Sequence, residues 1–328
     1  MQTRWRRPMP LSRHIAHVLL AAPVFVLSGA GSTWSQEYPT RPVRILTVGY
    51  GSNTDIATRV ITQAIPADFG QRMVVENRGI VAIDVASKAA PDGYTLLHYT
   101  NPLWLMPIFR ADAKWDPLSD FVPITQTLES PNLLVIHPSL PAKTVKELIA
   151  FAKTRPGELN YASSSTGSGN HVAAELFKSL AGIKVVRVNY KSGGQAVQDV
   201  VAGQVHLMFP AAGSAMPYVR TGKLRVLAVT SAKRSPLTPG IPTLAESGLP
   251  AYESSSVAAL MAPAGTPAAI VTRVNREFVR VLARPEIKER LLKAGIEAVG
   301  STPEALGAMI RSEMARMDKV VKASGLRE

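Results

Sequence analysis

Strand-like and helix-like segments alternate along most of this 328-residue chain. Apolar runs rich in β-branched residues predict strands, whereas Ile56, Val60 and Ile61 recur with the spacing of a buried helix face. The predicted strands are Val43 to Val48, Met73 to Val75, Tyr94 to Tyr99, Asn132 to His137, Val185 to Val188, Val205 to Phe209, Leu224 to Thr230 and Val257 to Met261. Repeated strand, helix, strand order predicts an α/β fold in which mainly parallel sheets are flanked by helices.

Polar segments stand where several predicted strands give way to predicted helices. They are Ser52 to Asp55, Ser164 to Asn170, Ser192 to Gly194, and Gly213-Ser214. The first turn of a helix has free N–H groups and carries the positive end of the helix dipole, so each segment can receive an anion. Ligands of open α/β sheets bind beyond the carboxyl ends of the strands, where these segments fall. We therefore expect a site for a small carboxylate.

The first 36 residues have the order of a secretory signal peptide. Four arginines precede an apolar stretch from Ile15 to Leu27, and small residues follow from Ser28 to Ser32. The apolar stretch is short for a bilayer span and is interrupted by Pro23. We expect residues 1–36 to be a cleaved signal peptide and the mature protein to be periplasmic.

Composition narrows the function classes further. The chain has no cysteine, which excludes disulfides, thiolate metal sites and a lipid-anchored N-terminal cysteine. Its formal net charge is +13, and removal of four arginines with residues 1–36 leaves +9, a balance that can steer anionic ligands. The basic residues are scattered and are not interleaved with aromatic residues, so nucleic acid is not the expected partner. We expect no metal and no cofactor.

A family resemblance covers nearly the whole mature chain. The segments that carry it are Glu37-Tyr38-Pro39 through Arg44-Ile45, Thr54-Asp55, Val75 to Arg78, Ala89 to Thr95, Tyr161 to Ser164, Val188 to Lys191, Gly203 to Val205, Gly222 to Arg225, Val229 to Ser235, and Pro242-Thr243 through Gly248 to Pro250. In order and spacing, these segments resemble the Bug-type (TctC-like) receptors, which are the periplasmic solute-binding proteins of tripartite tricarboxylate transporters.

The resemblance implies a two-lobed periplasmic binding protein fold of type II with a ligand cleft between the lobes. Lobe 1 would be discontinuous and comprise residues 37–125 and 229–328, and lobe 2 would comprise residues 126–228. A small organic acid would be captured in the cleft and delivered to membrane transporter subunits. We expect a monomer and no catalytic activity.

In lobe 1, the family's loop after the first strand corresponds to residues 49–55, so the candidate ligand-binding residues are Tyr50, Ser52, Asn53, Thr54 and Asp55. Tyr50 is a departure that can stack on a planar ligand or cover the cleft. Thr54 or Asp55 is expected to cap the following helix, and a capping role for Asp55 has at least as much support as a ligand contact.

The loop after Arg78 departs more strongly from the family pattern. A Pro-Gly-Ala-Gly-Gly run is replaced by residues 79–84, which include Ile80 and Val81. Glycine allows backbone to approach a ligand closely and β-branched residues do not, so the grip on a second carboxylate is in doubt. We predict a ligand with one carboxylate and an apolar or aromatic body that lies against Ile80 and Val81; the alternative is a receptor that has lost this binding mode.

In lobe 2, a serine-rich loop and the helix after it match the family well. The candidate ligand-binding residues are Ser164, Ser165, Thr166, Gly167, Ser168 and His171, followed by Tyr190, Ala212 and Gly213 in two later loops. Hydroxyls and main-chain donors would hold a carboxylate here, although some will only cap helices. His206 replaces an acid and is interpreted as structural.

Two alternative functions remain to be distinguished from uptake. A hydrolase is disfavoured because the sequence has no Gly-x-Ser-x-Gly elbow, zinc-protease signature or phosphate loop. A receptor that signals to a membrane kinase would use the same closed-lobe surface as a transport receptor, so the sequence leaves that alternative open.

Overall fold

A computed structural model describes residues 38–65 and 69–324 of the chain. The expected signal peptide, residues 1–36, lies outside the described residues. Among the described helices, none is long and apolar enough to cross a membrane.

One sheet of the described chain has six strands in the order β11-β4-β10-β3-β1-β2. The strands are β1 (Val43–Thr47), β2 (Met73–Asn77), β3 (Thr95–Thr100), β4 (Phe121–Pro131), β10 (Ser255–Pro263) and β11 (Glu297–Ala298). Strands β2 and β3 pair in parallel with β1, whereas β10 pairs antiparallel with both β3 and β4.

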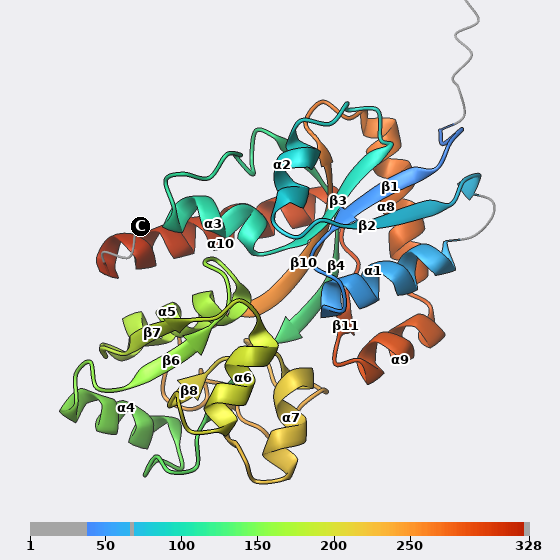
Figure 1. Cartoon of the computed structure of the whole chain (residues 1–328). Helices are drawn as coiled ribbons and strands as arrows, with labels where there is room; N and C mark the ends of the chain where they lie inside the picture. The colour runs from blue at the N-terminus through green and yellow to red at the C-terminus, as the bar shows by residue number, and fades with distance from the viewer. Residues whose placement is uncertain (1–37, 66–68, 325–328) are drawn as a thin grey trace, which may run out of the picture. The chain divides into compact units, whose positions relative to one another are not determined.

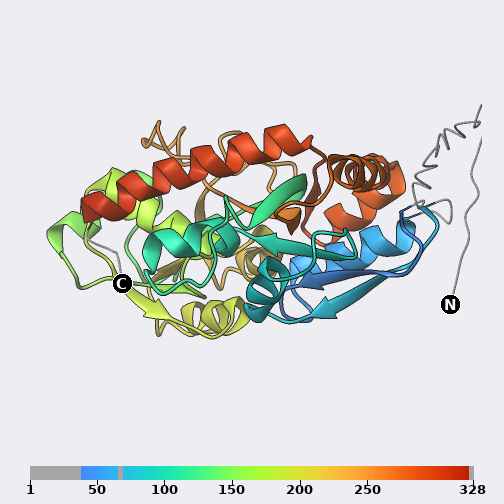
Figure 2. The ribbon, with the colours of Figure 1, turned by 90° about the horizontal axis from the view of Figure 1, so that it is seen from above.

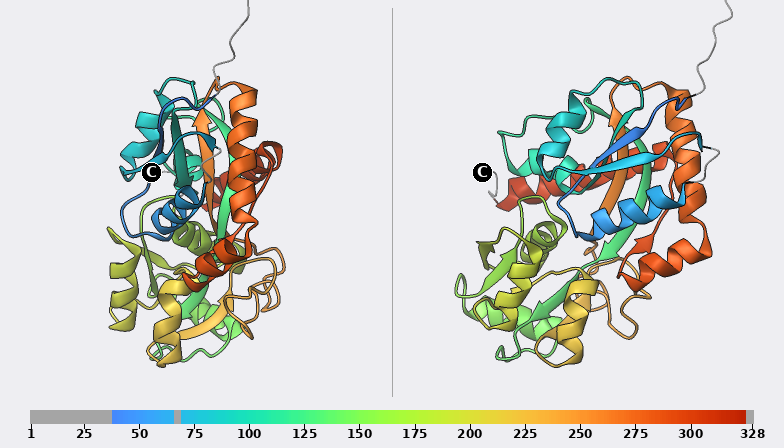
Figure 3. Two further views of the ribbon diagram at one scale, coloured as in Figure 1. Left: turned by 90° about the vertical axis from the view of Figure 1, so that its right-hand side faces the viewer. Right: turned by 45° about the vertical axis from the view of Figure 1, so that its right-hand side comes forward.

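Helices cover both faces of this first sheet (Figures 1 and 3). They are α1 (Asn53–Ala64), α8 (Ala268–Leu282) and α9 (Pro285–Lys293) on one face, and α2 (Val81–Ser87), α3 (Pro102–Phe109) and α10 (Pro303–Ser324) on the other. Neighbouring residues of one strand serve opposite faces, as expected from the two-residue period of a strand. Thus Ile45 packs in the cluster with α1 and α8, and Leu46 packs in the cluster with α2 and α10.

A second sheet in the described chain has five strands in the order β7-β6-β8-β5-β9. Its strands are β5 (Leu133–Ile136), β6 (Asn160–Ser163), β7 (Val186–Asn189), β8 (Leu207–Met208) and β9 (Arg225–Val229). The helices that flank it are α4 (Val145–Thr154), α5 (Gly169–Ala181), α6 (Gly193–Val201) and α7 (Ala212–Arg220).

The chain passes between the two sheets in both directions, and this corrects one expectation. The α/β class is confirmed, but each sheet is mixed and not mainly parallel. Strand β4 continues through Asn132 directly into β5, and the chain returns from β9 through residues 230–254 into β10. An outward and a return segment that lie side by side run in opposite directions, so β4 pairs antiparallel with β10, and β5 with β9.

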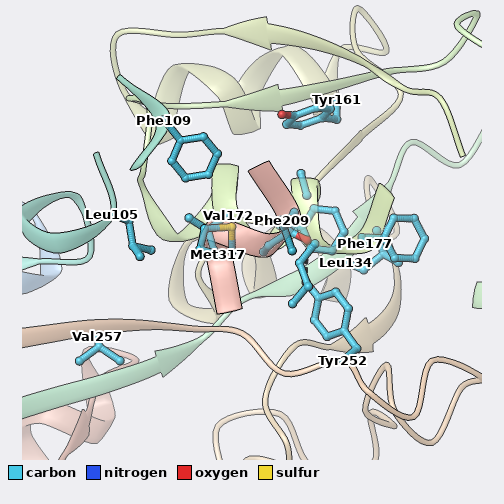
Figure 4. Packing of buried hydrophobic residues seen from close by; sticks show 14 of the residues in the cluster. Leu105, Phe109, Leu134, Tyr161, Val172, Phe177, Phe209, Tyr252, Val257 and Met317 are labelled. Atoms are coloured by element: carbon cyan, nitrogen blue, oxygen red, sulfur yellow. Dashed lines mark hydrogen bonds between the residues drawn. The ribbon is translucent and has the colours of Figure 1, made fainter. Parts of the chain in front are cut away.

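A hydrophobic cluster contains side chains from both sheets and from α10 (Figure 4). Leu134, Tyr161 and Phe177 belong to the second sheet and its helices, whereas Met317 lies on α10 and is fully buried. Figure 2 shows α10 running along elements of both sheets, and α10 contacts α3 and α5. The Tyr252 hydroxyl donates to the carbonyl of Ala173 on α5 at 2.7 Å, which adds a polar link to the same cluster.

Most predicted elements are confirmed, and their boundaries differ by a few residues. After Pro267 the sequence has amphipathic periodicity, and the described chain forms α8, α9 and α10 there. The cap of α1 is Ser52, whose Oγ accepts from the main-chain N–H of Asp55 at 3.2 Å, so the prediction that Thr54 or Asp55 caps this helix was wrong. The helix begins earlier than predicted because Ser52 has the extended backbone of a cap residue.

Candidate functional site

A cavity of about 350 Å³ lies between elements of the two sheets. It is lined by Val48, Ser52, Asn53, Thr54, Thr100, Asn101, Leu128, Ser130, Asn132, Ser164, Ser168, Gly169, Asn170, Gly193, Gly194, Met208, Pro210, Ala211, Ser214 and Ser256. Among these described lining residues there is no charged side chain, but hydroxyls and amides are abundant. The volume is within the range of small-molecule sites.

Helices from both sheets begin at this cavity. The first residues of α1, α5 and α6 line it, and so do Ala211 and Ser214 at the start of α7. The first N–H groups of each helix have no partner within that helix, and the helix dipoles place partial positive charge at the same end. The cavity can therefore stabilise an anion without a cationic side chain.

Asp55 organises the loop before α1 and does not line the cavity. Its carboxylate is buried and accepts from the main-chain N–H of Gly51 at 2.9 Å and from Arg59 Nε at 3.0 Å. Asn77 donates to the same carboxylate at 2.8 Å and to the carbonyl of Val48 at 2.9 Å. These bonds hold residues 48–55 in place, so Ser52, Asn53 and Thr54 reach the cavity while Asp55 supports them from behind.

Tyr50 lies on the outside of the same loop. Its side chain is 83% exposed, and the Arg59 guanidinium lies 5.5 Å from the centre of its ring. It does not line the cavity. Its predicted roles, stacking on a ligand or covering the cleft, stay predictions.

In the serine-rich loop, Asn170 gathers the residues that face the cavity. Its Oδ1 accepts from the main-chain N–H of Ser164 at 3.2 Å, from Ser164 Oγ at 3.1 Å and from Ser168 Oγ at 2.6 Å. All three residues line the cavity. The bonds fix the loop that leads into α5, which makes it a pre-formed part of the site.

Arg187 supports this loop from β7, a role that sequence reasoning missed. Its guanidinium donates to Ser163 Oγ at 2.7 Å, to Thr166 Oγ1 at 3.1 Å and to the carbonyl of Ser164 at 2.9 Å. The alternation of side chains along a strand predicts which face of the sheet Arg187 lies on. It does not predict these partners, because they lie more than twenty residues away in sequence.

The remaining predicted residues of this loop lie away from the cavity. Ser165 is exposed, and Thr166 is buried against Arg187. Gly167 has a φ of 76°, and a Cβ at this position would lie 3.0 Å from the main-chain nitrogen of Met106. His171 is buried, packs its ring 4.8 Å from that of Phe109, and accepts from the N–H of Gly167. Burial, with the Arg187 and Lys178 charges nearby, holds the pKa of His171 well below its ordinary value.

None of the residues predicted in the two later loops of the second sheet, Tyr190, Ala212 and Gly213, is among the residues that line the cavity. The Tyr190 hydroxyl donates to Asp199 at 2.8 Å, and burial together with the Asp199 carboxylate raises the pKa of Tyr190 to about 12. Ala212 and Gly213 lie in the first turn of α7, next to the lining residue Ala211. Gly193 and Gly194, from the segment before α6, line the cavity directly.

Ile80 and Val81 lie at the start of α2, which forms where the sequence indicated a shortened loop. Their side chains are 44% and 54% exposed, and neither lines the cavity. Their predicted contact with the body of a ligand stays a prediction.

Sequence reasoning missed the lining residues contributed by strand ends and by the crossing segments. These are Val48, Thr100, Asn101, Leu128, Ser130, Asn132, Met208, Pro210, Ala211 and Ser256. Asn101 accepts from the N–H of Val257 at 2.9 Å and donates to the buried carboxyl of Glu313 at 3.0 Å. Such residues carry no local sequence signal, because they become neighbours only when the chain crosses between the sheets.

Glycines make close contacts between elements of the two sheets near the cavity. A Cβ built on Gly295, which precedes β11, would lie 2.9 Å from the Cα of Gly213 on α7. A Cβ on Gly169, the first residue of α5, would lie 2.1 Å from Ser256 Oγ on β10. The absence of side chains at these positions lets α5 and α7 approach the first sheet closely.

The chemistry of the site is that of binding. His171 and Asp55 are engaged by their own loops, so the described residues do not assemble a Ser, His and Asp triad at the cavity. The described residues also contain no group of three or more His, Cys, Asp or Glu side chains suited to hold a metal ion.

Comparisons with known proteins agree with this arrangement. Residues 57–326 match the model of the tripartite tricarboxylate transporter family receptor. Protein BugT of Bordetella pertussis is 32% identical over 321 residues, which cover 95% of this chain and 98% of BugT. The structure of R. palustris Rpa4515 with adipate has a TM-score of 0.78 and 35% identity, covering 88% of this chain and 98% of that protein. The structure of the periplasmic binding protein BugD has a TM-score of 0.76 and 27% identity, covering 88% and 99%.

Proposed function

This chain belongs to the tripartite tricarboxylate transporter receptor family, and from that premise we propose that it captures a small organic acid in the periplasm and delivers it to transporter subunits in the membrane. The family consists of solute-binding receptors and not enzymes. The observation that carries the proposal is the convergence of α1, α5, α6 and α7 on one cavity that has no charged lining side chain among the described residues.

The physical chemistry of this cavity favours a carboxylate. A hydrogen bond to a charged group contributes about 1.5–3 kcal/mol, so about four main-chain and hydroxyl donors support micromolar binding, near −8 kcal/mol, after the costs of association. A cation would meet the positive ends of several helix dipoles, which oppose its binding. The family relative Rpa4515 was solved with adipate, a carboxylate of suitable size.

We further propose that the two sheets mark two lobes that close over the ligand. Lobe 1 would comprise residues 37–125 and 229–328, and lobe 2 residues 126–228. The crossing segments at Asn132 and residues 230–254 support two lobes, but the boundary between residues 125 and 126 falls within β4 (Phe121–Pro131), which belongs to the first sheet. The crossing at Asn132 favours a first boundary a few residues later. Closure would bury the ligand and form the surface that the membrane subunits recognise.

The number of carboxylates that the site holds can be tested with matched acids. Because Ile80 and Val81 replace glycines of the family pattern, we predict that hexanoate binds at least as tightly as adipate, which has the same six-carbon chain and a second carboxylate. Isothermal titration calorimetry of the mature protein with both acids measures the difference. Clearly tighter binding of adipate would reject the single-carboxylate prediction and leave the receptor function standing.

A thermal-shift screen tests the receptor function itself. A ligand that binds only the native state stabilises it by about 2.7 kcal/mol at a concentration of 100 Kd. We therefore expect at least one organic acid among C2 to C8 monocarboxylates and dicarboxylates to raise the melting temperature by several degrees. No shift with any of these acids at millimolar concentration would contradict the proposed function.

A further inference from the structure

Asn132 occupies the point where the chain first crosses between the two sheets. It is the single residue between β4 and β5, and both its main-chain N–H and its carbonyl form hydrogen bonds. Its N–H donates to Thr230 Oγ1 at 2.8 Å, and its carbonyl accepts from the N–H of Thr230 at 2.9 Å. Thr230 directly follows β9, so Asn132 joins the outward and return segments of the chain.

The side chain of Asn132 lines the cavity and is fixed at one end. Asn132 is 1% exposed, and its Oδ1 accepts from Ser256 Oγ on β10 at 3.2 Å. Its Nδ2 is buried and has no hydrogen-bond partner among the described residues. Of the buried side-chain polar atoms that lack a partner in the described part of the chain, only Asn132 Nδ2 belongs to a residue that lines this cavity.

Several other polar side chains around the cavity are engaged with protein groups. Ser130 Oγ donates to the carbonyl of Gly295 at 3.3 Å, and Ser214 Oγ donates to the carbonyl of Ala211 at 2.8 Å. Asn101 Nδ2 donates to Glu313 at 3.0 Å. A buried donor without a partner is unfavourable, and native proteins keep such groups where a ligand or water completes their bonding.

We infer that Asn132 is a ligand-binding residue whose Nδ2 donates a hydrogen bond to a carboxylate oxygen of the bound organic acid. This inference rests on the proposed function and identifies a side chain that recognises the carboxylate. Ser256 acts as a positioning residue, because its hydroxyl holds Oδ1 and thereby directs Nδ2 toward the ligand. The amide accepts no proton and undergoes no chemical change.

Two substitutions at Asn132 separate ligand binding from a structural role. Asn132→Ala removes both the donor and the acceptor, and we expect affinity for carboxylates to fall about tenfold or more, the loss of one hydrogen bond to a charged group. Asn132→Asp keeps an acceptor for Ser256 Oγ but places a carboxylate where the donor was. We expect Asn132→Asp to bind at least about a hundredfold more weakly than the wild type, because two carboxylates repel each other in a buried site.

The control is Gln204→Glu, which introduces the same charge at an exposed residue outside the cavity lining. All proteins are titrated calorimetrically with adipate, malate, hexanoate and benzoate, and the melting temperature of each ligand-free variant is measured. We expect Gln204→Glu to bind within about threefold of the wild type.

The outcomes distinguish the inference from the proposed function. If the wild type binds an acid and Asn132→Asp binds it equally well, the inference is wrong and the receptor function stands. If Asn132→Asp fails to fold, an unchanged affinity of Asn132→Ala overturns the inference in the same way. If the wild type binds neither these four acids nor any acid of the C2 to C8 screen, the proposed function fails and the inference falls with it.

Discussion

His98 on β3 is a histidine that folding keeps neutral. Its side chain is fully buried, with Nδ1 2.6 Å from Thr58 Oγ1 and Nε2 2.6 Å from Thr127 Oγ1. Burial lowers the pKa of His98 from 6.5 to about 3. Both ring nitrogens are engaged by hydroxyls, so the imidazole is a packing element behind the site and is not available to a ligand.

The pKa of His98 predicts a loss of stability in mild acid. Between pH 6.5 and pH 3 the unfolded state binds a proton at His98 and the folded state does not, so the free energy of unfolding decreases as pH falls through this range. The slope approaches 1.4 kcal/mol per pH unit for one such histidine, so His98 contributes a loss of about 2 kcal/mol between pH 7 and pH 5. His171, whose pKa is also lowered, adds to the loss in the same direction. Urea unfolding at the two pH values measures it.

A His98→Gln variant is the control for this pH dependence. Its free energy of unfolding is expected to change less than that of the wild type between pH 7 and pH 5, whatever its stability at pH 7. The pKa of the buried Glu313 is raised chiefly by burial, so this group makes the free energy of unfolding decrease as pH rises. It does so in both proteins and therefore does not account for a difference between them. Equal slopes would refute the assignment to His98.

At the scale of elements, the close contact between α7 and the turn before β11 requires glycine at Gly295, whereas a Cβ on Gly213 would lie at an ordinary contact distance of 3.4 Å from the carbonyl oxygen of Ala294. Gly295 has a φ of 76°, and its Cα faces Gly213 at the start of α7. A side chain here would separate α7 from the first sheet and widen the site. The approach of these two elements is therefore set by residues that make no polar contact with a ligand.

Gly295→Ala is expected to destabilise the protein and weaken carboxylate binding together. Gly222→Ala is the matched control, since Gly222 has a φ of 72° but open space around its Cα. Both variants bear the backbone strain of a non-glycine residue at positive φ, about 1–2 kcal/mol. Overpacking against Gly213 should add about 1–3 kcal/mol to Gly295→Ala alone, measured by urea unfolding. Equal losses in the two variants would show that the contact does not constrain α7.

Elements with strong apolar periodicity were predictable from the sequence, and three of the described strands, β4, β6 and the two-residue β11, were not. Strand β4 was missed because Pro123, Gln126 and Glu129 interrupt its apolar pattern, although it is the strand that leads out of the first sheet. Strand β6 has four residues and a polar first residue, Asn160, too short a pattern to distinguish from a loop. The polar loops Ser52 to Thr54 and Ser164 to Asn170 were found because helix starts have a local signature. Asn132 and Ser256 were not, because 124 residues separate them in the chain.

At the scale of the whole molecule, a basic protein surrounds a cavity whose described lining is uncharged. The charged side chains outside the cavity lining can therefore attract an anionic ligand over long distances, whereas uncharged groups in the cavity bind it at short range. Screening by salt acts on charges that are exposed and distant, and acts weakly on buried dipoles and hydrogen bonds.

We therefore expect ionic strength to change the association rate of a carboxylate and to leave its dissociation rate nearly constant. Between 10 mM and 300 mM salt, the association rate should fall by about threefold. Stopped-flow mixing with the tightest acid from the thermal-shift screen gives both rates. A constant association rate together with a faster dissociation would place the salt-sensitive charges at the ligand itself.

The shared hydrophobic cluster has a consequence for how this chain can be recombined. Helix α10 comes from the end of the sequence, yet it covers apolar side chains of α3 and α5. A chimera that exchanges residues 126–228 with those of a relative, in order to transplant ligand preference, would bring a foreign α5 against the resident α10. A chimera that folds should therefore take Met317 and its neighbours on α10 from the same relative as residues 126–228. Transfer of ligand preference then depends on the last helix of the protein.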